Sequence, residues 1–226
     1  MSLLDEDNPR DFLDFLILEN RQNHDIGYSS IALSMWQLYV GAGDTLTQTM
    51  RWMSLILSLY TDVQERCFDE LDRCYDQYRQ YREDACPYLC ATLDEIFRFR
   101  PIGDSLPHLT SEPVDIGGHL IPPCTMVRGS FTAIMHDPAN FDSPHQFNPS
   151  HFIDDNGRFV RDPRVCIFST GLRNCIGKKL AQVEFFSFAA HIIHRFRLVH
   201  VNGNLTPTTH NLLLKAGDFR VKFMTR

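Results

Sequence analysis

The chain has 226 residues, enough for one large hydrophobic core or about one and a half ordinary domains. Its residues are 43% hydrophobic and 22% charged, a composition typical of globular proteins that argues against a disordered chain. The net charge of -6 argues against nucleic acid as a partner, because phosphate groups bind to basic surfaces.

The first two predicted elements are helices. Asn8 can cap a short helix that has Pro9 in its first position. From about Tyr28 to Tyr60 the pattern stays helical without a proline, which predicts one long helix. Gly41 and Gly43 lie in its middle, where each glycine destabilises a helix by roughly 0.5–1 kcal/mol. We expect a close approach or a local opening of the helix at this point.

The rest of the chain is predicted as helices, a proline-rich irregular region and short strands. The expected helices cover residues 61–81, 86–99 and 178–196, and the expected strands cover residues 114–116 and 125–128. The end of the chain, at residues 212–214 and 219–223, alternates like a β-hairpin. The predicted fold class is therefore mainly α with a small β portion.

The seven cysteines include no Cys-x-x-Cys pair, which favours a reducing compartment over a disulfide framework. The spacing of Cys67, Cys74, Cys86 and Cys90 matches no usual zinc motif, so we interpret them as small residues on helix faces. No apolar run reaches the ~18 residues of a membrane span. The acidic stretch that follows Met1 is not typical of a signal peptide.

The strongest motif is the stretch from Phe168 to Gly177, FSTGLRNCIG, which fits FxxGxRxCxG at every fixed position. It closely resembles the cysteine-ligand loop of the cytochrome P450 family. The resemblance implies that Cys175 is the proximal ligand of the iron in heme b (iron protoporphyrin IX). A thiolate ligand donates electron density to iron and favours O–O cleavage. The alternative is a structural cysteine beside a turn, which the five fixed positions disfavour.

The resemblance gives the other residues of this loop a role as well. Arg173 can pair with a heme propionate, and Phe168 can shield the sulfur from water. Gly171 and Gly177 can allow tight turns and a close approach to the flat macrocycle. The helix expected from Lys178 directs its N-terminus at the cysteine, which favours the thiolate.

A second stretch, Gly41-Ala42-Gly43-Asp44-Thr45, resembles the family's (A/G)Gx(D/E)T sequence over the distal face of the heme. The resemblance implies that Thr45 and Asp44 are catalytic and guide the protons that oxygen activation consumes. Ala42 departs from the usual glycine, and Leu46 replaces a frequent threonine. An Asp-Thr pair taken alone would be only helix surface.

A third stretch, Glu95-Ile96-Phe97-Arg98, is the family's ExxR motif. Its spacing places Glu95 and Arg98 on one helix face. The family adds a basic residue from a PxRF-like segment, and here His151 takes the place of that arginine. We expect this group to lock the meander under the heme, with no part in the chemistry. The alternative is a surface ion pair, worth under ~1 kcal/mol.

A fourth, weaker match is Leu106-Pro107-His108, which resembles a segment whose histidine contacts a propionate. His108 is therefore a candidate heme-binding residue, and an ordinary loop residue is the equal alternative. The pocket walls that the resemblance implies are Trp36, Val40, Ile102, Leu106 and Leu213, each of which could also be plain core.

Basic residues surround the cysteine loop in an otherwise acidic chain. Arg161, Arg164, Lys178 and Lys179 are expected on the proximal side, where an NADPH–cytochrome P450 reductase-type donor would dock. Solvated loop charges are the alternative. We expect Arg173 to be buried against a propionate and leave it out of this group.

The resemblance extends from about Asn8 to Arg226 and covers the C-terminal half of a full family member. Residues 1–226 are thus expected to form a partial heme domain. The implied activity is monooxygenation of a small apolar organic substrate with O2, at the cytosolic face of the endoplasmic reticulum, with the membrane anchor in the missing N-terminal half. Two alternatives stay open: a truncated, inactive fragment or interaction module, and a heme-thiolate isomerase or dehydratase that does not use O2. Asp44 and Thr45 argue against the second.

Overall fold

The computed structural model describes residues 4–23, 27–104, 107–210 and 213–226. The chain divides into a small unit, Met1–Thr45, and a large unit, Leu46–Arg226. Helices predominate and the strands form two-stranded sheets, which confirms the predicted fold class. In the described part of the chain, no helix combines the length and the apolar character that crossing a bilayer requires.

The small unit contains α1, Phe12–Asn23, and the first part of α2, Tyr28–Leu59. The predicted start of α1 at Asn8 and Pro9 is wrong. The helix begins at Phe12 because Asp11 accepts a hydrogen bond from the backbone N–H of Asp14 at 2.9 Å and so caps the first turn. The long α2 agrees with its prediction.

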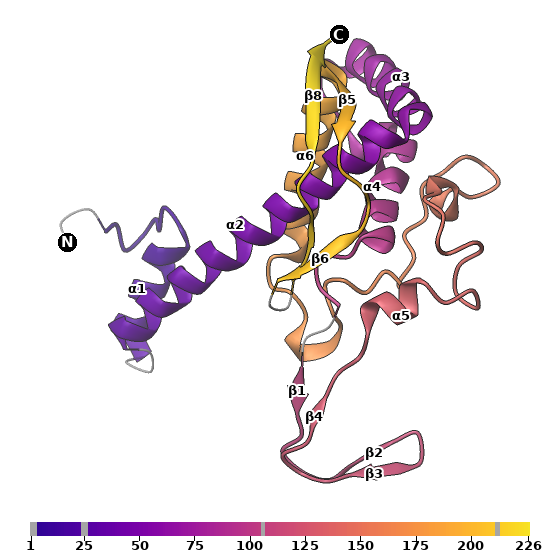
Figure 1. The fold of residues 1–226 in the computed structure, drawn as a ribbon. Coiled ribbons are helices and arrows are strands. Elements are labelled where there is room, and N and C mark those ends of the chain that lie inside the picture. Colours follow the sequence, from indigo (N-terminus) through magenta and orange to yellow (C-terminus); the bar gives the residue numbers. More distant parts are fainter. Residues whose placement is uncertain (1–3, 24–26, 105–106, 211–212) are drawn as a thin grey trace. The chain divides into compact units, whose positions relative to one another are not determined.

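The large unit is built around the second part of α2 together with α3, Thr61–Tyr78, α4, Pro87–Phe99, and α6, Lys178–Arg195. Figure 1 shows α3, α4 and α6 close to the strands β5, Phe196–Asn202, and β8, Arg220–Thr225. Their apolar faces share one core, which includes the fully buried Trp52 and Leu71. The buried amide of Gln64 bonds to Leu57 and Leu198, so it ties α3 to α2 and to β5.

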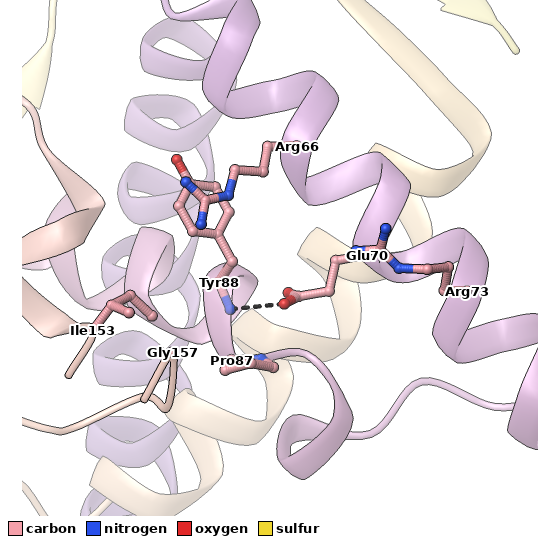
Figure 2. A pocket seen from close by; sticks show the side chains of 7 residues that line it. All are labelled: Arg66, Glu70, Arg73, Pro87, Tyr88, Ile153 and Gly157. Carbon is pink, nitrogen blue, oxygen red and sulfur yellow. Dashed lines mark hydrogen bonds between the residues drawn. The ribbon is translucent and has the colours of Figure 1, made fainter. Parts of the chain in front are cut away.

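The first turn of α4 is capped by a residue from another helix. Glu70 of α3 accepts hydrogen bonds from the backbone N–H groups of Tyr88 and Leu89, at 3.0 and 2.8 Å. Arg66 stacks on the Tyr88 ring beside it, with 3.8 Å between guanidinium and ring centroid (Figure 2). The carboxylate thus satisfies two N–H groups that a helix N-terminus leaves without partners. This contact fixes α4, which carries the ExxR motif, against α3.

The first four cysteines of the chain are buried in the core of the large unit. Cys67, Cys74 and Cys90 lie on helices, which confirms their interpretation as residues of helix faces, and Cys86 directly precedes α4. Burial raises the pKa of the Cys67 thiol to about 12, so this side chain behaves as a small apolar residue.

The proline-rich region contains two short antiparallel pairs. Strand β1, His108–Leu109, pairs with β4, Met126–Val127, and β2, Val114–Ile116, pairs with β3, His119–Ile121. Helix α5, Phe131–Met135, follows, and the short 3-10 helices are Glu83–Ala85, Pro149–Phe152 and Gly171–Arg173. The strand predicted at 114–116 is confirmed, and β4 lies within the predicted 125–128.

The predicted terminal hairpin is wrong in its pairing. Strand β7, Leu213–Ala216, pairs with β6, Pro207–His210, whereas β8 pairs with β5, which directly follows α6. The alternation correctly indicated two strands, but each of them pairs with a strand that lies earlier in the chain. Leu212 lies outside the described residues.

Candidate functional site

The cysteine loop is closed by its own backbone. The N–H of Cys175 donates to the carbonyl of Phe168 at 2.8 Å, and the N–H of Lys178 donates to the carbonyl of Cys175 at 3.3 Å. Gly171 has φ +72°, a left-handed conformation that favours glycine. The loop therefore ends at the first residue of α6, with the Cys175 thiol exposed.

Gly177 has a different reason to be glycine. It lies in the turn closed by the hydrogen bond from the Lys178 N–H to the Cys175 carbonyl, so the predicted tight turn is present, but its φ of -85° does not require glycine. A Cβ built there would lie 3.9 Å from the Cys175 sulfur, in ordinary contact. The close approach of Gly177 to a macrocycle stays a prediction.

Exposed apolar side chains flank the thiol in sequence. Leu172 and Ile176 are 103% and 84% exposed, and Leu180 and Val183 continue the exposed apolar surface along α6. Large apolar side chains this exposed next to a thiol mark a binding surface. A flat, mostly apolar macrocycle with an iron ligated by the thiolate fits this donor and its surroundings.

Two predicted heme-binding residues from distant segments line one cavity. His108 on β1 and Arg173 in the cysteine loop meet at a cavity of about 620 Å³, which Leu109 and Leu172 also line. Arg173 is exposed in this structure. A guanidinium and an imidazole beside apolar walls suit the carboxylates of a propionate-bearing group. The polar and apolar parts of the site both fit heme.

Phe168 is half-buried and packs against the large core. Its ring lies edge-on to the Phe97 ring, with 5.5 Å between centroids. Phe97 in turn contacts Phe185 of α6, so the start of the loop is held between α4 and α6. Shielding of the sulfur by Phe168 stays a prediction.

Asp44 and Thr45 belong to the small unit, whereas Cys175 belongs to the large one. The Thr45 hydroxyl donates to the carbonyl of Gly41 at 2.6 Å. Helix α2 continues through this stretch, so the local opening considered at Gly41 and Gly43 is absent from the described helix. The catalytic roles of Asp44 and Thr45 stay predictions.

Of the predicted pocket walls, Ile102 and Leu213 lie next to each other. The carbonyl of Ile102 accepts from the N–H of Leu214 at 2.7 Å, and Gly103 bridges to Leu213. Trp36 and Val40 are exposed residues of the small unit. Leu106 lies outside the described residues.

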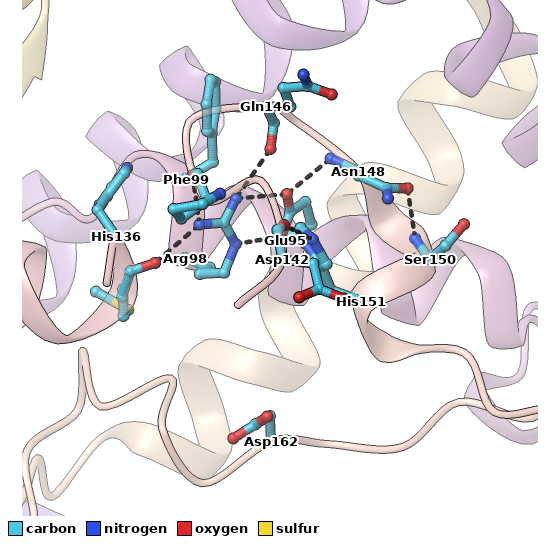
Figure 3. A network of polar contacts seen from close by, with 12 residues as sticks. Glu95, Arg98, Phe99, His136, Asp142, Gln146, Asn148, Ser150, His151 and Asp162 are labelled. Atoms are coloured by element: carbon cyan, nitrogen blue, oxygen red, sulfur yellow. Dashed lines mark hydrogen bonds and ion pairs between the residues drawn. The ribbon is translucent and has the colours of Figure 1, made fainter. Parts of the chain in front are cut away.

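The ExxR pair is fully buried, so the surface-pair alternative is wrong. Glu95 and Arg98 form a bidentate pair at 2.6 and 2.7 Å, and both side chains are 0% exposed (Figure 3). Arg98 also donates to the backbone carbonyls of Met135, Pro144 and Gln146. The pair thereby fastens the irregular region to α4, as predicted.

His151 completes this network in the place predicted for it. Its Nδ1 lies 3.3 Å from the Glu95 carboxylate, and its Nε2 lies 2.7 Å from the carbonyl of Asp142. Both partners accept hydrogen bonds, so this geometry favours the protonated imidazole, in which both ring nitrogens donate. The hydrogen bond that the Glu95 carboxylate accepts accordingly raises the pKa of His151.

Sequence reasoning missed a second buried carboxylate on α4. Asp94 is 4% exposed, and Arg161 donates to it at 3.1 Å. Arg164 pairs with Asp162, so Arg161 and Arg164 are ion-paired rather than free docking charges. Lys178 and Lys179 are exposed as expected. The sequence signal that could have indicated this buried carboxylate is the acidic residue directly before the ExxR glutamate.

Comparisons with known proteins agree with these features. The family model for cytochrome P450 matches residues 2–223. Cytochrome P450 2C7 of Rattus norvegicus is 34% identical over 206 residues, and cytochrome P450 2C40 of Mus musculus is 32% identical over 204 residues; each match covers 86% of this chain and 42% of the relative. Cytochrome P450 2C13, male-specific, of Rattus norvegicus is 31% identical over 234 residues, or 98% of this chain and 48% of the relative. The chain thus spans less than half the length of these relatives.

Proposed function

Because the chain belongs to the cytochrome P450 family, we propose that it forms the heme-binding part of a heme-thiolate monooxygenase. The reaction would insert one oxygen atom of O2 into a small apolar organic substrate. The observation that carries the proposal is the exposed Cys175 thiol, held in a closed loop among exposed apolar side chains.

Heme b, when bound, supplies the redox chemistry that activates oxygen. Cys175 would hold its iron. Arg173 and His108, which line one cavity, would bind its propionates through charge-assisted hydrogen bonds. Gly177 would let the macrocycle approach the loop closely, and Gly171 provides the turn that brings the cysteine to the start of α6.

Proton supply would come from the middle of α2. Thr45 would hold water through its hydroxyl, and the Asp44 carboxylate would exchange protons with solvent. In this structure the Thr45 hydroxyl donates to the carbonyl of Gly41, and a hydroxyl can accept hydrogen bonds as well as donate one.

Electrons would come from an NADPH–cytochrome P450 reductase-type donor. Lys178 and Lys179 are exposed next to the cysteine loop and would attract an acidic partner. By resemblance to the family, the whole protein would lie on the cytosolic face of the endoplasmic reticulum, anchored by a segment outside this chain.

The test is the absorption spectrum of the reduced protein with carbon monoxide. After expression with a heme precursor, we expect a thiolate-type Soret band that is lost in Cys175→Ser and retained in Cys124→Ser, which alters another exposed cysteine. A band that persists in Cys175→Ser contradicts the ligand assignment. A chain without heme would favour the inactive fragment. Heme-loaded protein that consumes neither NADPH nor O2 when reductase and candidate substrates are supplied would favour the isomerase or dehydratase.

A further inference from the structure

We propose that Asp94 is a positioning residue for the cysteine loop. Its buried carboxylate attracts a cation on each side of the loop and so holds Cys175 in place. The inference rests on the proposed function, since it assigns Asp94 a role only through Cys175.

The geometry joins three segments at one cavity. Asp94 on α4, Arg161 before the loop and Lys178 at the start of α6 all line a cavity of about 160 Å³ behind the loop. The Nε of Arg161 lies 3.1 Å from Oδ2 of Asp94. A single carboxylate therefore neighbours both the segment that leads into the loop and the helix that leaves it.

The charges explain why this arrangement holds. Asp94 is 4% exposed, and burial raises its pKa above the ordinary 3.8. Arg161 and Lys178 act in the opposite direction and favour the carboxylate, whereas Glu83 disfavours it. A buried carboxylate needs such cations to stay ionised, so the attraction draws both ends of the loop towards α4.

Packing carries this restraint to the cysteine. Phe97, one turn after Asp94, contacts the Phe168 ring, and the Lys178 ammonium lies 5.9 Å from the centroid of the same ring. The carbonyl of Phe168 accepts the hydrogen bond from the N–H of Cys175. The two routes from Asp94 thus converge on the residue that closes the loop.

The test is amide hydrogen exchange of the chain without heme, followed by mass spectrometry of peptides covering residues 166–178. We expect Asp94→Asn to increase exchange in this segment about tenfold, because the amides of Ser169, Asn174 and Cys175 are bonded within the loop. The matched control is Asp162→Asn, whose carboxylate pairs with Arg164 in the same stretch of chain. Exchange in β5 and the circular dichroism spectrum should stay unchanged in both variants.

Two further variants separate positioning from general destabilisation. Asp94→Glu keeps the charge and should restore most of the protection. Arg161→Gln removes the cation from a half-exposed side chain and should reproduce part of the loss of protection. This variant therefore tests the proposal even if Asp94→Asn fails to fold. Loop exchange at the parent rate in a folded Asp94→Asn chain, or in Arg161→Gln, would overturn the proposal.

A second readout distinguishes the failure of this inference from that of the proposed function. If Cys175 binds heme, Asp94→Asn should lower the fraction of chains with the thiolate-type spectrum, whereas Asp162→Asn should not. A parent chain without that spectrum contradicts the proposed function. A parent spectrum that Asp94→Asn leaves unchanged contradicts the positioning role alone.

Discussion

The carboxylate of Glu95 lies 2.6 Å from Nε of Arg98, and neither side chain is exposed to solvent. Removing one member would leave the other as a buried, unpaired charge. We therefore expect Glu95→Ala to lower the free energy of unfolding by about 3–5 kcal/mol. Chemical denaturation followed by circular dichroism would measure the free energy of unfolding. The control is Asp84→Asn, which removes an exposed carboxylate that pairs with Arg82. A Glu95→Ala chain as stable as the parent would contradict the structural role.

His151 should make stability depend on pH. Its pKa is raised above the ordinary 6.5 in the folded state, chiefly by the hydrogen bond with Glu95. A raised pKa means that its contribution is fully present below 6.5 and is lost as pH rises through the folded-state pKa. Urea unfolding from pH 6 to pH 9 should show this loss in the parent and a smaller one in His151→Arg, which keeps its charge. Identical pH profiles would rule out a protonated His151.

Gly171 and Gly177 should respond differently to alanine. Gly171 has φ +72°, so Gly171→Ala should lower the free energy of unfolding by about 1–2 kcal/mol through backbone strain. Gly177 has φ -85°, so Gly177→Ala should leave the stability of the heme-free chain unchanged. Thermal unfolding of both variants gives the comparison. Equal destabilisation of the two would mean that the left-handed turn is not what selects glycine at position 171.

Thr45→Ala should separate electron use from product formation in a full-length protein that contains this chain. Without the hydroxyl, protons would arrive through unguided water, and peroxide would replace part of the product. The measurement is the ratio of peroxide and product to NADPH consumed. Thr47→Ala, an exposed threonine two residues along the same helix, is the control. Equal coupling in the two variants would remove Thr45 from the proton path.

Local motifs allowed the sequence to predict the cysteine loop, the ExxR pair and the substitute histidine, because fixed spacings determine which residues face one another. Partners far apart in sequence were missed. Arg161 was expected to be a free charge, but Asp94, which lies 67 residues earlier, binds it. The strand at the end of the chain was also predicted. Its pairing with β5 was not, because the position of β5 depends on how α6, which precedes it, packs in the fold. Periodicity reports which face is buried and carries no information on the neighbour that buries it.

The last prediction concerns the two lysines that remain exposed beside the cysteine loop. Arg161 and Arg164 are ion-paired with Asp94 and Asp162, and Lys178 is attracted by Asp94, so Lys179 is the stronger candidate for steering an acidic electron donor. Charge reversal in Lys179→Glu, which leaves Lys178 beside Asp94, should slow heme reduction in a full-length protein at low salt. The difference should shrink as salt increases, because exposed charges are screened over about 10 Å at 0.1 M.

The control for this experiment is Lys222→Glu, which changes the net charge equally at an exposed position of β8. Stopped-flow reduction rates at several ionic strengths would compare the three proteins. A general effect of net charge would slow both variants alike, whereas docking at the cysteine loop would slow only the first. Reduction of the first variant at the parent rate in low salt would exclude Lys179 from the docking surface.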